Sequence, residues 1–288
     1  MKERISNMES RRKFLKLAGA GAIAGGMLPF VSMAENVMDS PPTKEIFNLS
    51  IAGYSFLAYK ADVDKVVDVC KAVDVNYVSL KDFSLPYNST QEKTDEIIGK
   101  FKAASITVYG LGVIYMKTQQ DVDNAFAYAK RAGVNLIIAS PAYDLLPYVE
   151  KKAKESQIRI AIHNHGPEDK LFPDVKSIYD KIKNMDPVIG ICMDMGHTFR
   201  SGQDPAAVLI KYHSRIYDMH LKDVDEPVRE GNTVINGMGK IDFVSFVKAL
   251  RKTKYAGHCS LEFETRKDPA MGIAQSIGNF RGFLGCVR

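Results

Sequence analysis

The sequence predicts an α/β fold in which a single domain forms a (β/α)8 barrel. Apolar strand segments and amphipathic helix segments alternate after residue 45, at intervals of about 25 to 40 residues as βα units require. Eight alternating strands favour a closed barrel, with a doubly wound open sheet as the alternative. The expected strands span residues 47–54, 77–82, 107–114, 135–140, 159–165, 190–196, 216–222 and 258–264.

The helices between these strands are predicted from apolar residues at i, i+3, i+4 and i+7. Ser89 with Glu92 has the pattern of a capping box, which marks one helix start. Asp204 before Pro205 marks another, because proline suits the first helical turn. The spacing is kept by Val63, Val66, Val67 and Cys70, by Val122, Ala125, Phe126 and Ala129, and by Phe243, Phe246, Val247 and Leu250.

The first 34 residues are predicted to be a twin-arginine export signal and not part of the fold. Arg11 and Arg12 precede a mildly apolar, glycine-rich run that is too short for a comfortable membrane span. Small residues at 32–34 suit a signal peptidase, so the mature chain is expected to be residues 35–288, without a membrane span. The expected destination is the periplasm. A basic tail or an uncleaved anchor is the alternative.

Without this segment the chain is nearly neutral. Residues 1–34 contain six of the 39 Lys and Arg residues and two of the 34 Asp and Glu residues, so 33 basic and 32 acidic residues remain. A net charge of +1 provides no field that attracts a polyanion. Nucleic acid is therefore not an expected partner.

Imidazole and carboxylate side chains collect at the ends of the last four predicted strands, in the segments IAIHNHG, ICMDMGH, YDMHLKD and SLEFE. A lone carboxylate there usually caps a helix, but four of the six histidines fall at these ends. The carboxyl ends of parallel barrel strands converge, so the coincidence predicts a divalent metal site. The candidate residues are His163, His165, Asp194, His197, His220, Glu262 and Glu264.

These segments resemble the sugar phosphate isomerase/epimerase family, the xylose-isomerase-like TIM barrels. HNHG, MDMGH, HLKD, GMGKIDF and YAGHCSLEFE appear in the family's order and at its spacing, from residue 163 to residue 264. The resemblance implies one divalent ion, Mn, Co, Zn or Mg, bound by Asp194, His220, Glu262 and a residue of the fifth strand. His165 is assigned to that fourth place, with His163 as the alternative.

The resemblance also implies a small carbohydrate substrate. His197 is expected to contact substrate oxygens, and His163 and Lys222 are further candidates for substrate binding. Tyr54, Tyr115 and Tyr143, near strand ends, can form walls for a sugar ring, although half-buried aromatic residues are common without that role. Pairs of subunits occur among relatives, so a homodimer stays open.

One departure from the family bears on mechanism. Many epimerases of the family have a glutamate on the fifth strand that acts as ligand and acid/base group, where this chain has histidine. A ligating histidine is a poor proton carrier, so epimerisation by two bases is in doubt. We expect removal of a proton next to a ketone, with Glu264 as the first candidate base and Lys81 as the second. Glu262 combines a catalytic role with metal binding.

The segment KDFSLP, which begins at Lys81, together with YGLGVIYM at 109–116, resembles a periplasmic branch of the family from carbohydrate-degrading bacteria. Some members of that branch are associated with the cleavage of 3-keto-glycosides by elimination. Isomerase and lyase activities both remain open. The sequence is also compatible with a carbohydrate-binding barrel without turnover, and less so with a phosphodiesterase similar to the apurinic endonucleases.

Overall fold

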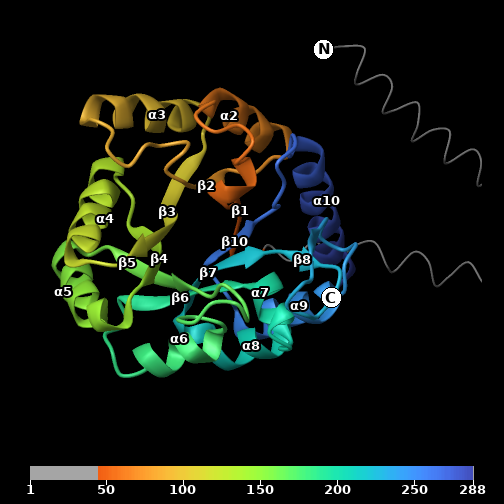
Figure 1. The fold of residues 1–288 in the computed structure, drawn as a ribbon. Helices are drawn as coiled ribbons and strands as arrows, with labels where there is room; N and C mark the ends of the chain where they lie inside the picture. Colours follow the sequence, from red (N-terminus) through yellow and green to blue (C-terminus); the bar gives the residue numbers. More distant parts are fainter. Residues whose placement is uncertain (1–44, 288) are drawn as a thin grey trace, which may run out of the picture. The chain divides into compact units, whose positions relative to one another are not determined.

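The computed structural model describes residues 45–287, in which eight parallel strands close into a barrel with the order β1-β10-β7-β6-β5-β4-β3-β2. Helices surround these strands (Figure 1). The (β/α)8 prediction is confirmed, and the open sheet is excluded. The barrel strands are β1 (Asn48–Ile51), β2 (Tyr77–Leu80), β3 (Thr107–Met116), β4 (Leu136–Pro141), β5 (Arg159–His163), β6 (Ile189–Asp194), β7 (Ile216–Leu221) and β10 (His258–Leu261).

The predicted helix patterns fall on helices, and their apolar residues face the strands. Asp204 caps its helix as expected, with its side chain accepting from the backbone NH groups of residues 206 and 207. The helix cap that was predicted at Ser89 lies one residue later, because Thr90 accepts from Lys93 N. The helices are α2 (Val63–Ala72), α3 (Gln91–Ala103), α4 (Gln119–Ala132), α5 (Leu146–Ser156), α6 (Val175–Ile182), α7 (Met195–Arg200), α8 (Pro205–Tyr212), α9 (Phe243–Thr253) and α10 (Ala270–Cys286).

Six of the eight strands end earlier than predicted at the carboxyl end of the barrel, β5, β6 and β10 among them. β5 ends at His163, so His165 lies in a loop, where its backbone NH donates to Phe172 O instead of continuing the sheet. β6 ends at Asp194, because that residue caps α7. β10 ends at Leu261, which leaves Glu264 beyond the strand. The alternating side-chain directions of a strand therefore do not apply to His165 or Glu264.

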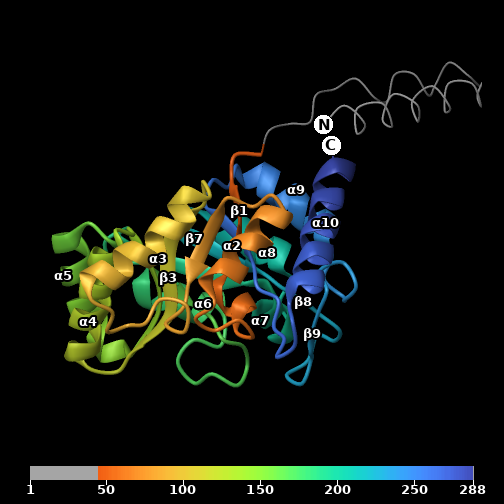
Figure 2. The ribbon, with the colours of Figure 1, turned by 90° about the horizontal axis from the view of Figure 1, so that it is seen from above.

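Short elements connect the barrel to the loops around its carboxyl end. They are η2 (Gly53–Phe56), η3 (Tyr143–Leu145), η4 (His213–Arg215) and the antiparallel pair β8 (Asp223–Val224) and β9 (Thr233–Val234). Figure 2 shows the loop after β5 and the β8–β9 pair projecting from the same end of the barrel. The ends of β5, β6, β7 and β10 thus lie beneath loops that can enclose a ligand.

The main core lies between the strands and the helices. All six residues of β4 and all six of β6 are buried, as expected for parallel strands that are covered on both faces. The two apolar strands hold the loops at the carboxyl end in place. The export signal predicted for residues 1–34 lies outside the described residues.

In residues 45–287, no helix is long and apolar enough to cross a membrane.

Candidate metal centre

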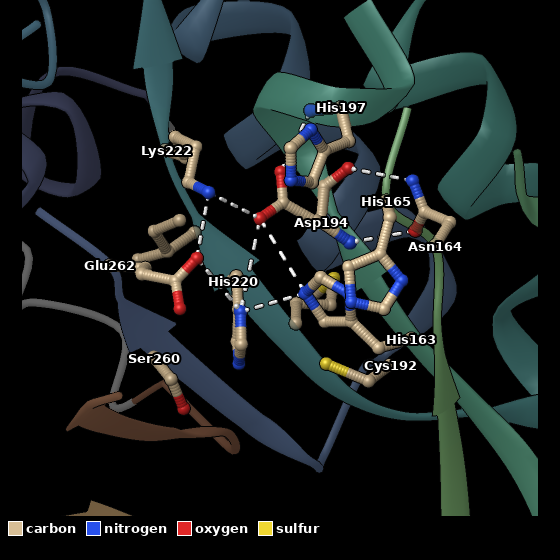
Figure 3. Close-up of polar contacts among 12 residues, drawn as sticks. His163, Asn164, His165, Cys192, Asp194, His197, His220, Lys222, Ser260 and Glu262 are labelled. Carbon is tan, nitrogen blue, oxygen red and sulfur yellow. Dashed lines mark hydrogen bonds and ion pairs between the residues drawn. The ribbon is translucent and has the colours of Figure 1, made fainter. Parts of the chain in front are cut away.

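Four buried side chains converge at the carboxyl end of the barrel, three at the ends of β5, β6 and β7 and the fourth directly after β10. His163, Asp194, His220 and Glu262 each offer a ligand atom that lies within 4.8 Å of the others (Figure 3). His220 Nδ1 lies 3.1 Å from His163 Nε2, 3.8 Å from Asp194 Oδ2 and 3.3 Å from Glu262 Oε2. Two imidazole nitrogens and two carboxylate oxygens suit a divalent transition ion such as Mn, Co or Zn. We call these four residues the metal cluster.

The structure brings His163, and not the expected His165, into this cluster. The two rings are neighbours, with centroids 4.5 Å apart. His165 instead has Nδ1 3.2 Å from Asp169 Oδ2 and Nε2 3.1 Å from the hydroxyl of Tyr115. The early end of β5 explains the difference, because the loop turns the second histidine towards the end of β3.

Asp194 combines two roles that the sequence presented as alternatives. Its Oδ1 accepts from His197 N at 2.8 Å and so caps α7, while Oδ2 faces the cluster. Asn164 Oδ1 accepts from Asp194 N at 2.9 Å, and Thr198 Oγ1 donates to Asp194 O at 2.6 Å. These bonds orient the carboxylate before any ligand arrives.

Lys222 lies among the carboxylates. Its Nζ is 2.9 Å from Asp194 Oδ2, 2.7 Å from Glu262 Oε2 and 2.6 Å from Glu264 Oε1. Burial opposes the charge, but these three carboxylates raise the pKa of Lys222 well above its ordinary value. Gly196 makes room for the side chain, since a Cβ there would lie 2.7 Å from Lys222 Cδ. The MDMGH and HLKD segments are thus packed against each other.

The charges of this region suit a divalent cation. Asp194, Glu262 and Glu264 bring three negative charges against the single ammonium of Lys222. Burial alone would lower the pKa of His220, but the carboxylates of Glu262, Asp218 and Asp194 overcome it and raise the pKa to about 9. A site that attracts a proton in this way retains negative potential, which a metal ion would neutralise in place of that proton.

A second group consists of His163, Cys192 and His220. Burial, together with the nearby carboxylates of Asp218 and Asp194, raises the pKa of the Cys192 thiol well above its ordinary value. A metal ion needs the thiolate, so this environment favours the nitrogen and oxygen donors of the metal cluster.

His197 lies beside the cluster but is held by other groups. Its Nδ1 is 3.1 Å from Arg200 Nη1, and Arg200 Nη2 donates to Glu168 Oε1 at 2.9 Å. Because a guanidinium only donates, Nδ1 accepts and the neutral ring carries its hydrogen on Nε2. Burial lowers the pKa of His197 to about 4, so this form persists at neutral pH.

The remaining predicted residues are spread around the barrel mouth. Lys81 Nζ donates to Val113 O at 3.1 Å and lies 5.8 Å from the centre of the Tyr54 ring. Tyr115 is 55% exposed. Tyr143 is directed elsewhere, since its hydroxyl donates to Leu171 O. Glu264 is exposed at the rim, where it contacts Lys222.

Three polar residues of the site were missed by sequence reasoning. Asn164 holds Asp194, and Asp169 Oδ2 lies 3.2 Å from His165 Nδ1. Asp223 accepts from the backbone NH groups of Gly237, Gly239 and Ile241, and so shapes the GMGKIDF segment. All three stand next to or near predicted ligands, but they act through backbone or loop contacts that periodicity does not reveal.

Comparison with known proteins places this chain in a family. The model of the family described as Xylose isomerase-like TIM barrel matches residues 58–283. An inosose dehydratase from Clostridium beijerinckii is 30% identical over 146 residues, which are 44% of this chain and 47% of that protein. The chain thus matches about half the length of this curated relative.

Two solved structures share the fold. The IOLI protein with a zinc atom superimposes with a TM-score of 0.69 at 16% identity, covering 83% of this chain and 98% of the other. The 3-keto-D-glucoside 4-epimerase YcjR from E. coli gives a TM-score of 0.65 at 14% identity, with 82% and 99% covered. Together with the match over most of its length, the barrel and the buried cluster show that this chain belongs to the Xylose isomerase-like TIM barrel family.

Proposed function

We propose that this protein is a metal-dependent enzyme that removes a proton next to the ketone of a keto-sugar and eliminates the neighbouring oxygen substituent. The observation that carries the proposal is the metal cluster, with the ammonium of Lys222 among its carboxylates. Binding alone would not need a preformed set of His, Asp and Glu ligands beside a buried cation. An enzyme of the carbon–oxygen lyase class uses all of these groups.

A bound divalent ion would polarise the ketone and make the adjacent hydrogen more acidic. His163, Asp194, His220 and Glu262 are the residues proposed to hold it. Lys222 keeps its charge and can stabilise the negative charge that develops on the ketone oxygen. Glu264 stands at the exposed rim, 2.6 Å from Lys222, and is proposed to take the proton.

The names of the relatives support this reaction class. The relative from Clostridium is a dehydratase, so it removes water from an inosose. Elimination needs one base and a leaving group, whereas epimerisation by two bases needs a second acid/base group on the opposite face. His163 stands in the cluster where many epimerases carry glutamate, which favours elimination. The 4-epimerase likeness keeps epimerisation as the second candidate.

We also propose that the enzyme works in the periplasm on an uncharged keto-sugar. This part rests on the twin-arginine motif in residues 1–34 and on the nearly neutral remainder of the chain. Sugar phosphates belong to cytoplasmic pools, so an exported enzyme would meet neutral sugars and glycosides. Fusion of residues 1–34 to a reporter that is active only after folded export would test the location.

Metal content and an NMR time course test the proposal together. Residues 35–288 would be purified, analysed for bound metal, and mixed with methyl 3-keto-glucoside in deuterated water. We expect about one metal ion per chain and metal-dependent release of methanol. Metal-dependent epimer formation without release would favour the epimerase instead. A protein that binds no added metal would contradict both.

A further inference from the structure

A cavity of about 440 Å³ lies at the ends of β2 and β3. Its walls come from the end of β2, the loop before α3, the end of β3 and helix α4. The lining residues that matter for its chemistry are Lys81, Asp82, Tyr87, Tyr115 and Asp121. Pockets of this size hold small organic ligands, so the volume is sufficient for a sugar ring.

Two lining residues connect the cavity with the metal cluster. The hydroxyl of Tyr115 lies 3.1 Å from His165 Nε2, and the ring of His165 is 4.5 Å from that of His163. Lys81 also lines the cavity, where its Nζ bonds to the backbone of β3 at Val113 O. A substrate over the cluster can therefore extend into the cavity past these two side chains.

The cavity lining selects a neutral, hydroxylated ligand. Asp82 and Asp121 bring two carboxylates, which repel anions. Asp121 Oδ2 already accepts from the backbone NH groups of Lys117 and Thr118, so Asp82 is the freer acceptor for sugar hydroxyls. Tyr87 and Tyr115 bring aromatic rings, against which the apolar face of a sugar ring packs. With one lysine against two carboxylates among its lining residues, the cavity is a poor phosphate site.

Lys81 is oriented at the boundary by two contacts. Its Nζ donates to Val113 O at 3.1 Å and lies over the ring of Tyr54. Burial lowers the pKa of Lys81, although the charges of Asp82 and Glu262 act in the opposite direction. The ammonium can therefore release a proton more readily than that of an exposed lysine.

We infer that the cavity holds the leaving group of a glycoside substrate, a neutral sugar ring, and that Lys81 donates a proton to the glycosidic oxygen. The inference rests on the proposed function and names its substrate class. A base removes the C2 proton beside the 3-ketone, the C1–C2 double bond forms, and the C1–O bond breaks. The leaving oxygen takes the proton of Lys81 and departs as an alcohol, and solvent restores both protonation states.

The leaving-group site is tested by comparing two substrates. Asp82→Asn removes a charge but no volume, and Asp82 is exposed, so the variant should fold. We expect kcat/KM to fall about tenfold more for a 3-keto-disaccharide than for methyl 3-keto-glucoside, because any effect of the lost charge on Lys81 acts on both substrates. Tyr87→Ala should show the same selectivity. Asp68→Asn, an exposed carboxylate on α2, is the matched control and should affect neither substrate.

Proton donation by Lys81 is tested through the acidity of the leaving group. Lys81→Met should lower kcat about 100-fold for methyl or sugar leaving groups, which need a proton. With 4-nitrophenyl 3-keto-glucoside the loss should be small, because nitrophenolate leaves without protonation. A merely structural role would lower turnover of all these substrates equally, and that result would overturn the assignment.

The outcomes separate the inference from the proposed function. Wild-type protein that releases no alcohol from any 3-keto-glycoside contradicts the proposed function, and the inference fails with it. Normal wild-type release, with Asp82→Asn and Tyr87→Ala affecting both substrates equally, contradicts the leaving-group site alone. Selective loss with the larger substrate supports both.

Discussion

Two buried polar groups lie at different heights in the same barrel. The upper one is the metal cluster, and the lower one consists of Tyr109, Asp218, Ser260 and Ser50. They are joined by β7, on which Asp218 and His220 are two residues apart and face the same way. Both groups consist of polar side chains that are shielded from solvent.

The two groups differ in how their hydrogen-bonding capacity is used. In the lower group the Tyr109 hydroxyl lies 2.5 Å from Ser260 Oγ, which donates to Asp218 Oδ1 at 3.1 Å and lies 2.7 Å from Ser50 Oγ. Burial raises the pKa of Asp218 to about 6, in spite of these bonds. The hydrogen bonds of the lower group thus run among its own members, and Asp218 Oδ2 also lies 4.0 Å from His220 Nε2 of the metal cluster.

The upper group, by contrast, keeps its carboxylates charged. Burial opposes the charge of Glu262, but Lys222 and His220 hold its pKa well below the usual range. Charged oxygens and imidazole nitrogens then face one point. Burial of polar side chains therefore does not by itself mark a metal site. Charged, buried ligand atoms that converge on one point do mark one.

The largest effect is expected for a substitution that alters the upper group alone. Glu262→Gln keeps the volume but removes a charged ligand, so metal affinity should fall about 100-fold or more and activity should be lost. Isothermal titration with Mn or Zn measures the affinity. Glu264→Gln is the matched control and should bind metal normally while kcat falls. Full activity in both variants would show that the site is misassigned.

The next effect depends on pH. With a pKa of about 9, His220 carries a proton at neutral pH in the metal-free protein, and metal binding must displace it. Affinity should therefore rise by about tenfold per pH unit below that pKa and level off above it. Calorimetry in buffers of different ionisation enthalpy should detect about one proton released. Affinity that stays constant from about pH 7 to 8.5 would contradict the assignment.

A smaller effect is expected for the packing that positions Lys222. Gly196→Ala places a methyl group against the lysine stem, which should cost about 1–3 kcal/mol of unfolding free energy. Displacement of Lys222 should lower kcat while metal stays bound. Denaturant unfolding measures the loss of stability, and metal titration checks that the metal stays bound. Gly99→Ala in α3 is the matched control, since nothing lies within 4 Å of a Cβ there.

The smallest effect is expected for a substitution in the lower group. Tyr109→Phe removes the hydroxyl shared by Asp218 and Ser260, and should cost about 1–3 kcal/mol of unfolding free energy. Metal affinity should stay within about threefold, because no atom of the metal cluster bonds to that hydroxyl. A large loss of affinity would mean that the lower group orients His220 after all.

Much of this architecture is readable from local patterns. Eight apolar segments separated by amphipathic helices led to the barrel, because burial on both faces demands that pattern of parallel strands. The approximate position of the site followed as well, since the carboxyl ends of barrel strands converge. Asp194, His220 and Glu262 were predicted as ligands and lie together in the structure, although their binding of metal stays a prediction.

Tertiary structure decided what local patterns leave open. The choice between His163 and His165 depends on where β5 stops, which is set by hydrogen bonds to neighbouring strands and to Phe172. The place of Lys222 among three carboxylates depends on Gly196 and on residues that are distant in the chain. Periodicity reports which face of an element is buried, but not which side chains from different elements meet, because that depends on register and loop path.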